Sequence, residues 1–129
     1  MEFVKNQEKY WEFIRQIRND KRVKAGFIQQ EHIAQENHLE YMEKYGKNFY
    51  ICLVDGHPAG YVGVIDRDIR VATHPDFQGK GVGKFMINAL MTLYPNSLAK
   101  VKIENRASLR LFEACGFEKR YYILEKNAS

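Results

Sequence analysis

The sequence lacks long hydrophobic runs and has few of the residues that build disulfide or metal frameworks. No apolar stretch approaches the roughly 18 residues of a membrane-spanning helix, and the N-terminus lacks the hydrophobic core of a signal peptide. Its two cysteines, Cys52 and Cys115, are isolated and in no metal-ligand spacing, so we expect both to be reduced and buried. These absences predict a cytoplasmic protein that binds no metal and no membrane.

The chain also lacks a concentrated block of positive charge. Its 20 Lys and Arg residues exceed its 16 Asp and Glu residues, which gives a net charge of +4, but the acidic residues are interspersed. We therefore expect no nucleic-acid partner, and the mild positive charge suits an acidic small ligand or a solvated basic surface. At 129 residues, 45% of them hydrophobic, the chain is expected to form one domain over residues 1–129, as a monomer or a homodimer.

Apolar periodicity predicts two helices in the first third of the chain. A short strand at residues 3–4 precedes a helix over 5–19, in which Tyr10, Phe13, Ile14 and Ile17 share one face. Residues 21–27 are predicted to be a loop, followed by a helix over 29–45. His38 falls within the apolar stripe of that second helix. It fits either a core histidine with one hydrogen bond or a histidine that faces a substrate cleft.

The rest of the chain reads as an antiparallel meander followed by alternating helices and strands. Strands are predicted at 49–54, 59–65 and 69–73, joined by tight turns, and a helix follows over 82–93. Alternation over 98–103 predicts a parallel crossover strand, a helix is predicted over 106–115, and a closing strand over 121–125. The expected class is α+β, with a central mixed, mostly antiparallel sheet flanked by about four helices.

Three glycines stand between the third meander strand and the helix that follows it. Gly79, Gly81 and Gly83 permit a close backbone approach, and a helix N-terminus attracts anions, so this stretch predicts a phosphate or pyrophosphate site. A P-loop needs Ser or Thr after its lysine, but Phe85 stands there. A dinucleotide fingerprint needs a third glycine where Met86 stands.

The remaining pattern is Gln78-x-x-Gly81-x-Gly83, joined downstream by Asn105-x-x-Ser108-x-x-x-Phe112-x-x-x-Gly116-Phe117. Together they resemble the two acyl-CoA-binding motifs of the GNAT superfamily of N-acetyltransferases, over residues 49–126. The resemblance implies a GNAT-like fold and acetyl-CoA as co-substrate. It also implies direct acetyl transfer to the primary amine of a small acceptor.

Carried over to this chain, the family's motifs assign a set of acetyl-CoA contacts. The loop amides would hold the pyrophosphate, through Gln78, Gly79, Lys80, Gly81, Val82, Gly83 and Lys84. Main chain of the preceding strand, Val71, Ala72 and Thr73, would bind the pantetheine arm as an added strand would. Asn105, Ser108 and Phe112 would line the arm from the other side, although Asn105 could serve only as a helix cap and Phe112 only as core.

Direct transfer needs a base for the amine, a donor for the developing oxyanion and an acid for the departing thiolate. A main-chain N–H near Val71 or Ala72 is the oxyanion candidate. The family's usual acid is a tyrosine, but Phe112 stands at that position and cannot donate a proton. Tyr121 or Tyr122 could substitute, as could water.

Four residues near the ends of the predicted strands are candidates for the base: Asp66, Asp68, His74 and Glu104. Asp68 stands beside the strand that leads to the cofactor and Glu104 ends the adjacent predicted strand. With Tyr121 they form the set of candidate catalytic residues, each of which could also be an ordinary turn or surface residue.

The acceptor is expected to meet the N-terminal helices and the turn at 66–68. The segment Trp11-x-x-Ile14-Arg15-x-x-Arg18-Asn19-Asp20, followed by Phe27 and His38, is similar to a subgroup that acetylates nucleotide-linked amino sugars. Arg15 or Arg18 could pair with a nucleotide diphosphate, or both could be exposed helix charges. The alternatives are a protein N-terminal or lysine amine, and a protein that binds acyl-CoA without catalysis.

Overall fold

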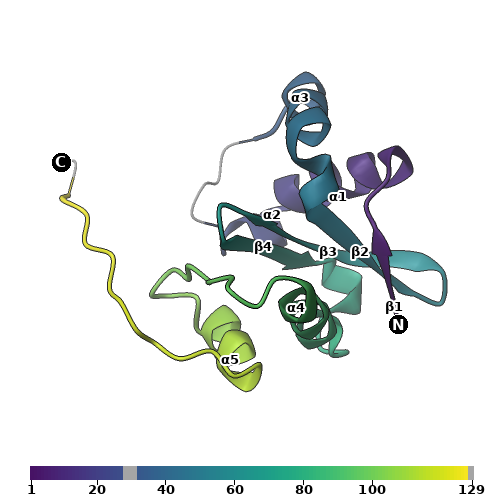
Figure 1. The fold of residues 1–129 in the computed structure, drawn as a ribbon. Helices are drawn as coiled ribbons and strands as arrows, with labels where there is room; N and C mark the ends of the chain where they lie inside the picture. The colour runs from purple at the N-terminus through teal and green to yellow at the C-terminus, as the bar shows by residue number, and fades with distance from the viewer. Residues whose placement is uncertain (28–31, 128–129) are drawn as a thin grey trace.

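The computed structural model describes residues 1–27 and 32–127 of the chain. Its centre is a four-stranded antiparallel sheet in the order β1-β2-β3-β4 (Figure 1). The strands are β1 (Glu2–Lys5), β2 (Phe49–Val54), β3 (His57–Ile65) and β4 (Asp68–Thr73). The turn between β3 and β4 is Asp66-Arg67, both at positive φ of 52° and 67°, as a two-residue hairpin requires. All four strands were predicted from the sequence.

Helices cover both faces of the sheet (Figure 1). On one face, α1 (Trp11–Asn19) and α3 (Gln35–Tyr45) bury Ile14, Ile17 and Met42 against β2 and β3. On the other face, α4 (Val82–Leu93) and α5 (Arg106–Ala114) enclose a core that includes Met86 and Leu90. Short 3-10 turns, η1 (Glu8–Tyr10), η2 (Gly46–Asn48) and η3 (Pro75–Phe77), connect these elements. The α+β class is confirmed.

Three predictions need correction in the N-terminal third. The predicted helix 5–19 begins only at Trp11, because Lys5 still belongs to β1 and the 3-10 turn η1 comes before the helix. The predicted loop 21–27 contains α2 (Lys21–Lys24), which starts because the Asp20 carboxylate accepts a hydrogen bond from the Arg22 amide at 2.8 Å. The predicted helix 29–45 begins only at Gln35. Residues 32–34 have no regular structure, and residues 29–31 of that prediction lie outside the described part of the chain.

The predicted strand over 98–103 is wrong, because this segment leaves the sheet after a single contact. Leu98 forms one parallel bridge to Asp68, with the Ile69 amide donating to the Leu98 carbonyl at 2.9 Å. The segment is then drawn towards the end of α2, where Lys102 Nζ donates to the Ala25 carbonyl at 3.2 Å. Ile103 is 90% exposed. The parallel part of the expected mixed sheet is thus limited to that bridge.

The predicted strand over 121–125 is also wrong. In Figure 1 the C-terminal segment runs as an extended chain away from the sheet, and no regular structure is assigned to residues 115–127. Tyr121 and Leu124 are each 91% exposed. A strand needs a neighbour to pair its backbone, and this segment has no place in the four-stranded sheet.

Candidate active site

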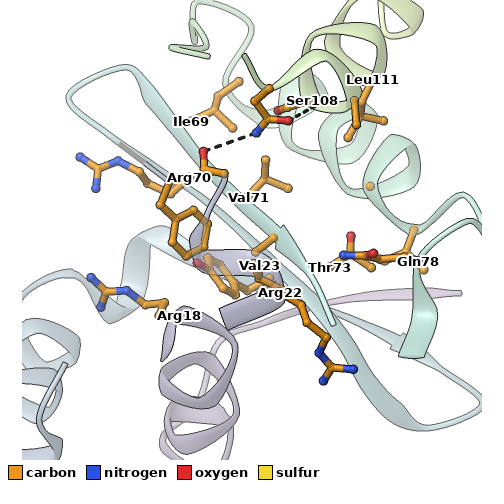
Figure 2. Close-up of a pocket in the computed structure, with 18 of the residues that line it drawn as sticks. Arg18, Arg22, Val23, Ile69, Arg70, Val71, Thr73, Gln78, Ser108 and Leu111 are labelled. Carbon is orange, nitrogen blue, oxygen red and sulfur yellow. Dashed lines mark hydrogen bonds between the residues drawn. The ribbon is translucent and has the colours of Figure 1, made fainter. Parts of the chain in front are cut away.

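A cleft of about 1140 Å³ opens beside β4, between α2 on one side and α4 and α5 on the other. Figure 2 shows its two ends: Arg18 and Arg70 lie at one end, and Thr73 and Gln78 lie at the other. The cleft exists because the chain after Leu98 turns away from β4, so the outer edge of that strand stays open. The open edge connects the start of β4 with the glycine loop.

The direction of each β4 amide follows from two hydrogen bonds. The Ile69 amide points outward to Leu98, whereas the His74 amide points inward to the Ala59 carbonyl of β3 at 2.8 Å. Because N–H direction alternates along an antiparallel strand, the amides of Val71 and Thr73 point outward, into the cleft. The amide of Ala72 points towards β3. Of the two predicted oxyanion donors, only Val71 therefore presents its N–H to the cleft.

The glycine loop at the far end of β4 leads directly into α4, and the first backbone amides of a helix have no hydrogen-bond acceptor within that helix. Gly79 and Gly81 have φ values of 78° and 81°, which few other residues adopt. Gly81 is the N-cap of α4, and the described residues provide no side-chain cap at that position. The first amides of α4 and its dipole therefore face the cleft, beside Gln78 and Lys84. Lys80 lies over the Phe77 ring, 5.4 Å from its centroid.

Gly83 serves the site through packing. A Cβ at Gly83 would lie 2.8 Å from Cδ2 of Leu111. The absence of a side chain at Gly83 lets α5 approach the first turn of α4, which closes one wall of the cleft.

The second motif belongs to the same wall, at the start of α5 and along it. Asn105 caps α5 by accepting a hydrogen bond from the Ser108 amide at 3.1 Å, and its Nδ2 donates to the Gly26 carbonyl at 3.4 Å. Asn105, Ser108 and Phe112 all line the cleft. Phe112 is 4% exposed and packs edge-on against Phe117, with their ring centroids 5.1 Å apart. Asn105 is thus a helix cap that also joins α5 to the turn after α2.

Comparison with known proteins decides the family. The model of the acetyltransferase (GNAT) family matches residues 10–117 of the chain. The chain belongs to this family. The match confirms the predicted GNAT fold and makes the chain an acetyl-CoA-dependent N-acetyltransferase. A search of curated proteins found no match.

Solved structures share the fold at low sequence identity. A ribosomal-protein-alanine N-acetyltransferase from Brucella melitensis superposes with a TM-score of 0.80 at 16% identity, covering 92% of this chain and 85% of that one. Spermidine N-acetyltransferase from Vibrio cholerae, in complex with CoA and spermine, gives 0.79 at 17% identity, with 97% and 85% covered. An aminoglycoside acetyltransferase in complex with coenzyme A gives 0.72 at 18% identity, with 92% and 84% covered.

The three candidate catalytic residues lie in different surroundings in this acetyltransferase. Asp68 lines the cleft, and its Oδ2 accepts from Arg70 Nε at 3.1 Å. Glu104 points to solvent with 73% of its side chain exposed and pairs with Lys102 at 3.5 Å. Tyr121 is on the exposed C-terminal segment. Of the three, the structure brings only Asp68 to the cleft.

Two tyrosines that the sequence did not single out also line the cleft. Tyr61 of β3 is 4% exposed and pairs across the sheet with Ala72. Burial raises the pKa of the Tyr61 phenol, so it stays protonated at neutral pH. Tyr41 of α3 lies close to Arg18, whose guanidinium carbon is 4.5 Å from the ring centroid. Burial likewise raises the pKa of Tyr41.

The end of the cleft away from the glycine loop is basic. Arg18 and Arg70 lie at this end (Figure 2), whereas Arg22 also lines the cleft but extends away from them. Two of these arginines have carboxylate partners: Asp20 for Arg22 and Asp68 for Arg70. Within the described residues, Arg18 has no carboxylate partner. Arg15 lies outside the cleft lining and is held by Glu12, with Nη2 and Oε1 2.6 Å apart.

Across the described residues, no helix has both the length and the apolar character needed to cross a membrane. The same residues contain no cluster of three or more His, Cys, Asp or Glu side chains arranged to hold a metal ion.

Proposed function

We propose that this acetyltransferase transfers the acetyl group of acetyl-CoA directly to the primary amine of a nucleotide-linked amino sugar. One observation carries the choice of acceptor: Arg18 lines the cleft, one β4 length from the glycine loop, and has no carboxylate partner among the described residues. A guanidinium binds phosphate oxygens through two parallel hydrogen bonds. An acceptor with a phosphate group would satisfy Arg18, whereas a polyamine or a basic peptide would be repelled by it.

The described residues fit acetyl-CoA. The first amides of α4, with Gly79 and Gly81 at positive φ, form a cradle with no side-chain cap among the described residues, and the pyrophosphate would lie there. The pantetheine arm would bind along the open edge of β4, where the amides of Val71 and Thr73 point outward. Ser108 and Phe112 would line its other side.

When bound, acetyl-CoA supplies a thioester: the amine nitrogen bonds to the acetyl carbon, the carbon–sulfur bond breaks, and the amine's proton finally resides on the CoA thiol. The Val71 amide would stabilise the developing oxyanion. Asp68 would accept the proton of the amine, since it lines the cleft on the same strand as Val71. Tyr61 lines the cleft with its phenol protonated, so it would donate a hydrogen bond to the departing thiolate, and the proton held by Asp68 would then pass to that thiolate.

A panel of acceptors tests this function. The protein is incubated with acetyl-CoA, and release of CoA thiol is measured with a uridine-diphosphate-linked 4-amino sugar and with the same amino sugar lacking the nucleotide. Spermine, an N-terminal alanine peptide and a lysine peptide complete the panel. We expect kcat/KM for the nucleotide-linked sugar to exceed that for the free sugar by more than tenfold.

Two results would overturn the proposal. Equal kcat/KM for the two sugars, or a peptide as the best acceptor, would show that Arg18 does not select a phosphate and would favour a protein amine. Tight binding of acetyl-CoA without thiol release for any amine would favour the non-catalytic alternative, for which Phe112 at the usual tyrosine position is the supporting observation.

A further inference from the structure

We propose that His38 is a positioning residue for Arg18, and that it thereby sets the affinity of the site for the phosphate groups of the acceptor. This inference rests on the proposed function. His38 lies on α3 outside the cleft lining and is 2% exposed. Within the described chain it is the one polar or charged residue that is buried. A buried imidazole needs partners for both nitrogens, and each nitrogen of His38 has a partner on α1.

The two partners of His38 require the same tautomer. Nε2 lies 2.7 Å from the Trp11 carbonyl oxygen, and since a carbonyl only accepts, Nε2 must carry the hydrogen. Nδ1 lies 3.4 Å from Nη1 of Arg18, and since a guanidinium only donates, Nδ1 must offer its lone pair. Burial lowers the pKa of His38, so the neutral ring that both contacts require is the form present at neutral pH.

Arg18 is therefore held from α3 by two side chains one helical turn apart. His38 accepts a hydrogen bond from Nη1, and Tyr41 presents its ring to the guanidinium at 4.5 Å in a cation–π contact. In Figure 2 the Arg18 side chain extends towards the end of the pocket where Arg70 also lies. An arginine whose rotamer is already fixed loses less freedom when it binds phosphate than a free surface arginine does.

A structural role and a positioning role of His38 would depend on different ring nitrogens. The bond from Nε2 to Trp11 ties α3 to the start of α1 and contributes to stability. The bond at Nδ1 acts only on Arg18. Two substitutions separate these roles, because a glutamine amide can reach the place of Nε2 and an asparagine oxygen occupies the place of Nδ1.

The test compares His38→Gln with His38→Asn, with Arg18→Gln as the reference for losing the anion contact. Uridine diphosphate is the probe, and its Kd is measured by calorimetry with CoA present. Melting temperature and the Kd of CoA are measured in parallel. We expect His38→Gln to keep the melting temperature and the CoA affinity while weakening uridine diphosphate binding by 5- to 20-fold. His38→Asn should lower the melting temperature but weaken the probe less than His38→Gln does.

The double variant of Arg18→Gln with His38→Gln should bind the probe no more weakly than Arg18→Gln alone, because His38 acts through Arg18. Unchanged probe affinity in His38→Gln, alongside a weakened Arg18→Gln, would overturn the positioning role and leave the proposed function standing. If the loss of uridine diphosphate affinity parallels the drop in melting temperature, it will be larger in His38→Asn than in His38→Gln. That result would assign His38 a structural role only. Unchanged affinity in Arg18→Gln would overturn both proposals.

Discussion

Gly81 offers a direct test of where the pyrophosphate binds, because two nearly isosteric substitutions there differ only in charge. Gly81 has φ of 81°, and a Cβ built on it has no other heavy atom within 4 Å among the described residues. Any side chain thus causes backbone strain without a steric clash. Asn and Asp are the residues that tolerate left-handed backbone best, so Gly81→Asn and Gly81→Asp share this strain.

The expected difference between the two variants comes from charge alone. Two unit charges 4 Å apart repel each other by about 1 kcal/mol in water and by about 4 kcal/mol at the effective dielectric of about 20 near a protein surface. Gly81 is exposed, which favours the lower part of this range. Since about 1.4 kcal/mol is tenfold in Kd, Gly81→Asp should bind CoA roughly fivefold to fiftyfold more weakly than Gly81→Asn.

The assay is calorimetric titration of CoA into the three proteins at low and high salt, with melting temperatures as the control for folding. At about 1 M salt the screening length shrinks to about 3 Å, so the gap between Asp and Asn should narrow. Equal affinity of the Asp and Asn variants at low salt would place the pyrophosphate away from Gly81. A gap that does not respond to salt would show that the loop changed shape.

Three further outcomes are expected. Asn105→Ala should lower the free energy of unfolding by about 1 kcal/mol through loss of the α5 cap. Asn105→Asp keeps the oxygen that accepts from the Ser108 amide, so it should retain most of that stability. Equal melting temperatures for the two variants would refute the cap assignment. Asp68→Asn should lower kcat by about 10²-fold if the Asp68 carboxylate accepts the proton of the amine. Glu104 is exposed and outside the cleft lining, so kcat of Glu104→Gln should stay within about twofold of the wild type. A larger loss of kcat in Glu104→Gln than in Asp68→Asn would assign the base to Glu104. Burial lowers the pKa of His38 despite the hydrogen bond to Trp11, with Arg18, Arg15 and Glu12 as the charged groups acting on it. The unfolded chain therefore binds its proton first, so stability should be full above about pH 6.5 and fall as the pH drops towards the lowered pKa; chemical denaturation of His38→Gln should show a shallower acid loss, and parallel curves would contradict this.

The sequence predicted well those parts of the fold that depend on local rules. The tight turn at Asp66 and Arg67 and the N-cap Asn105 each depend on a few adjacent residues, and both are present. The glycine loop belongs to the same class. Its proposed function as an anion-binding site depends on backbone angles that Gly79 and Gly81 permit and on the start of one helix.

Predictions failed where the outcome depended on distant parts of the chain. Alternation over 98–103 is a sound strand pattern, but the contacts of Lys102 with Ala25 and of Asn105 with Gly26 draw that segment to α2. Neither contact has a local signal, because the partners are 77 and 79 residues apart in the chain. Tyr61 was missed for a different reason. Only the register of β3 against β4 places it opposite Ala72 at the cleft.

The two ends of the cleft therefore differ in how they can be recognised. In the proposed function, the donor is recognised by backbone amides, which every sequence supplies, so a few glycines suffice to predict the site. The acceptor is recognised in that proposal by Arg18, and Arg15 on the same helix carries the same side chain. What separates the two is their partners: Glu12 neutralises Arg15 one turn away, while Arg18 meets His38 and Tyr41 of α3. An uncompensated charge that is held in place by uncharged groups is available to a ligand, whereas a paired one is not. If Arg18 binds the acceptor as proposed, selectivity for the acceptor depends on the packing of α3 against α1 as much as on the arginine itself.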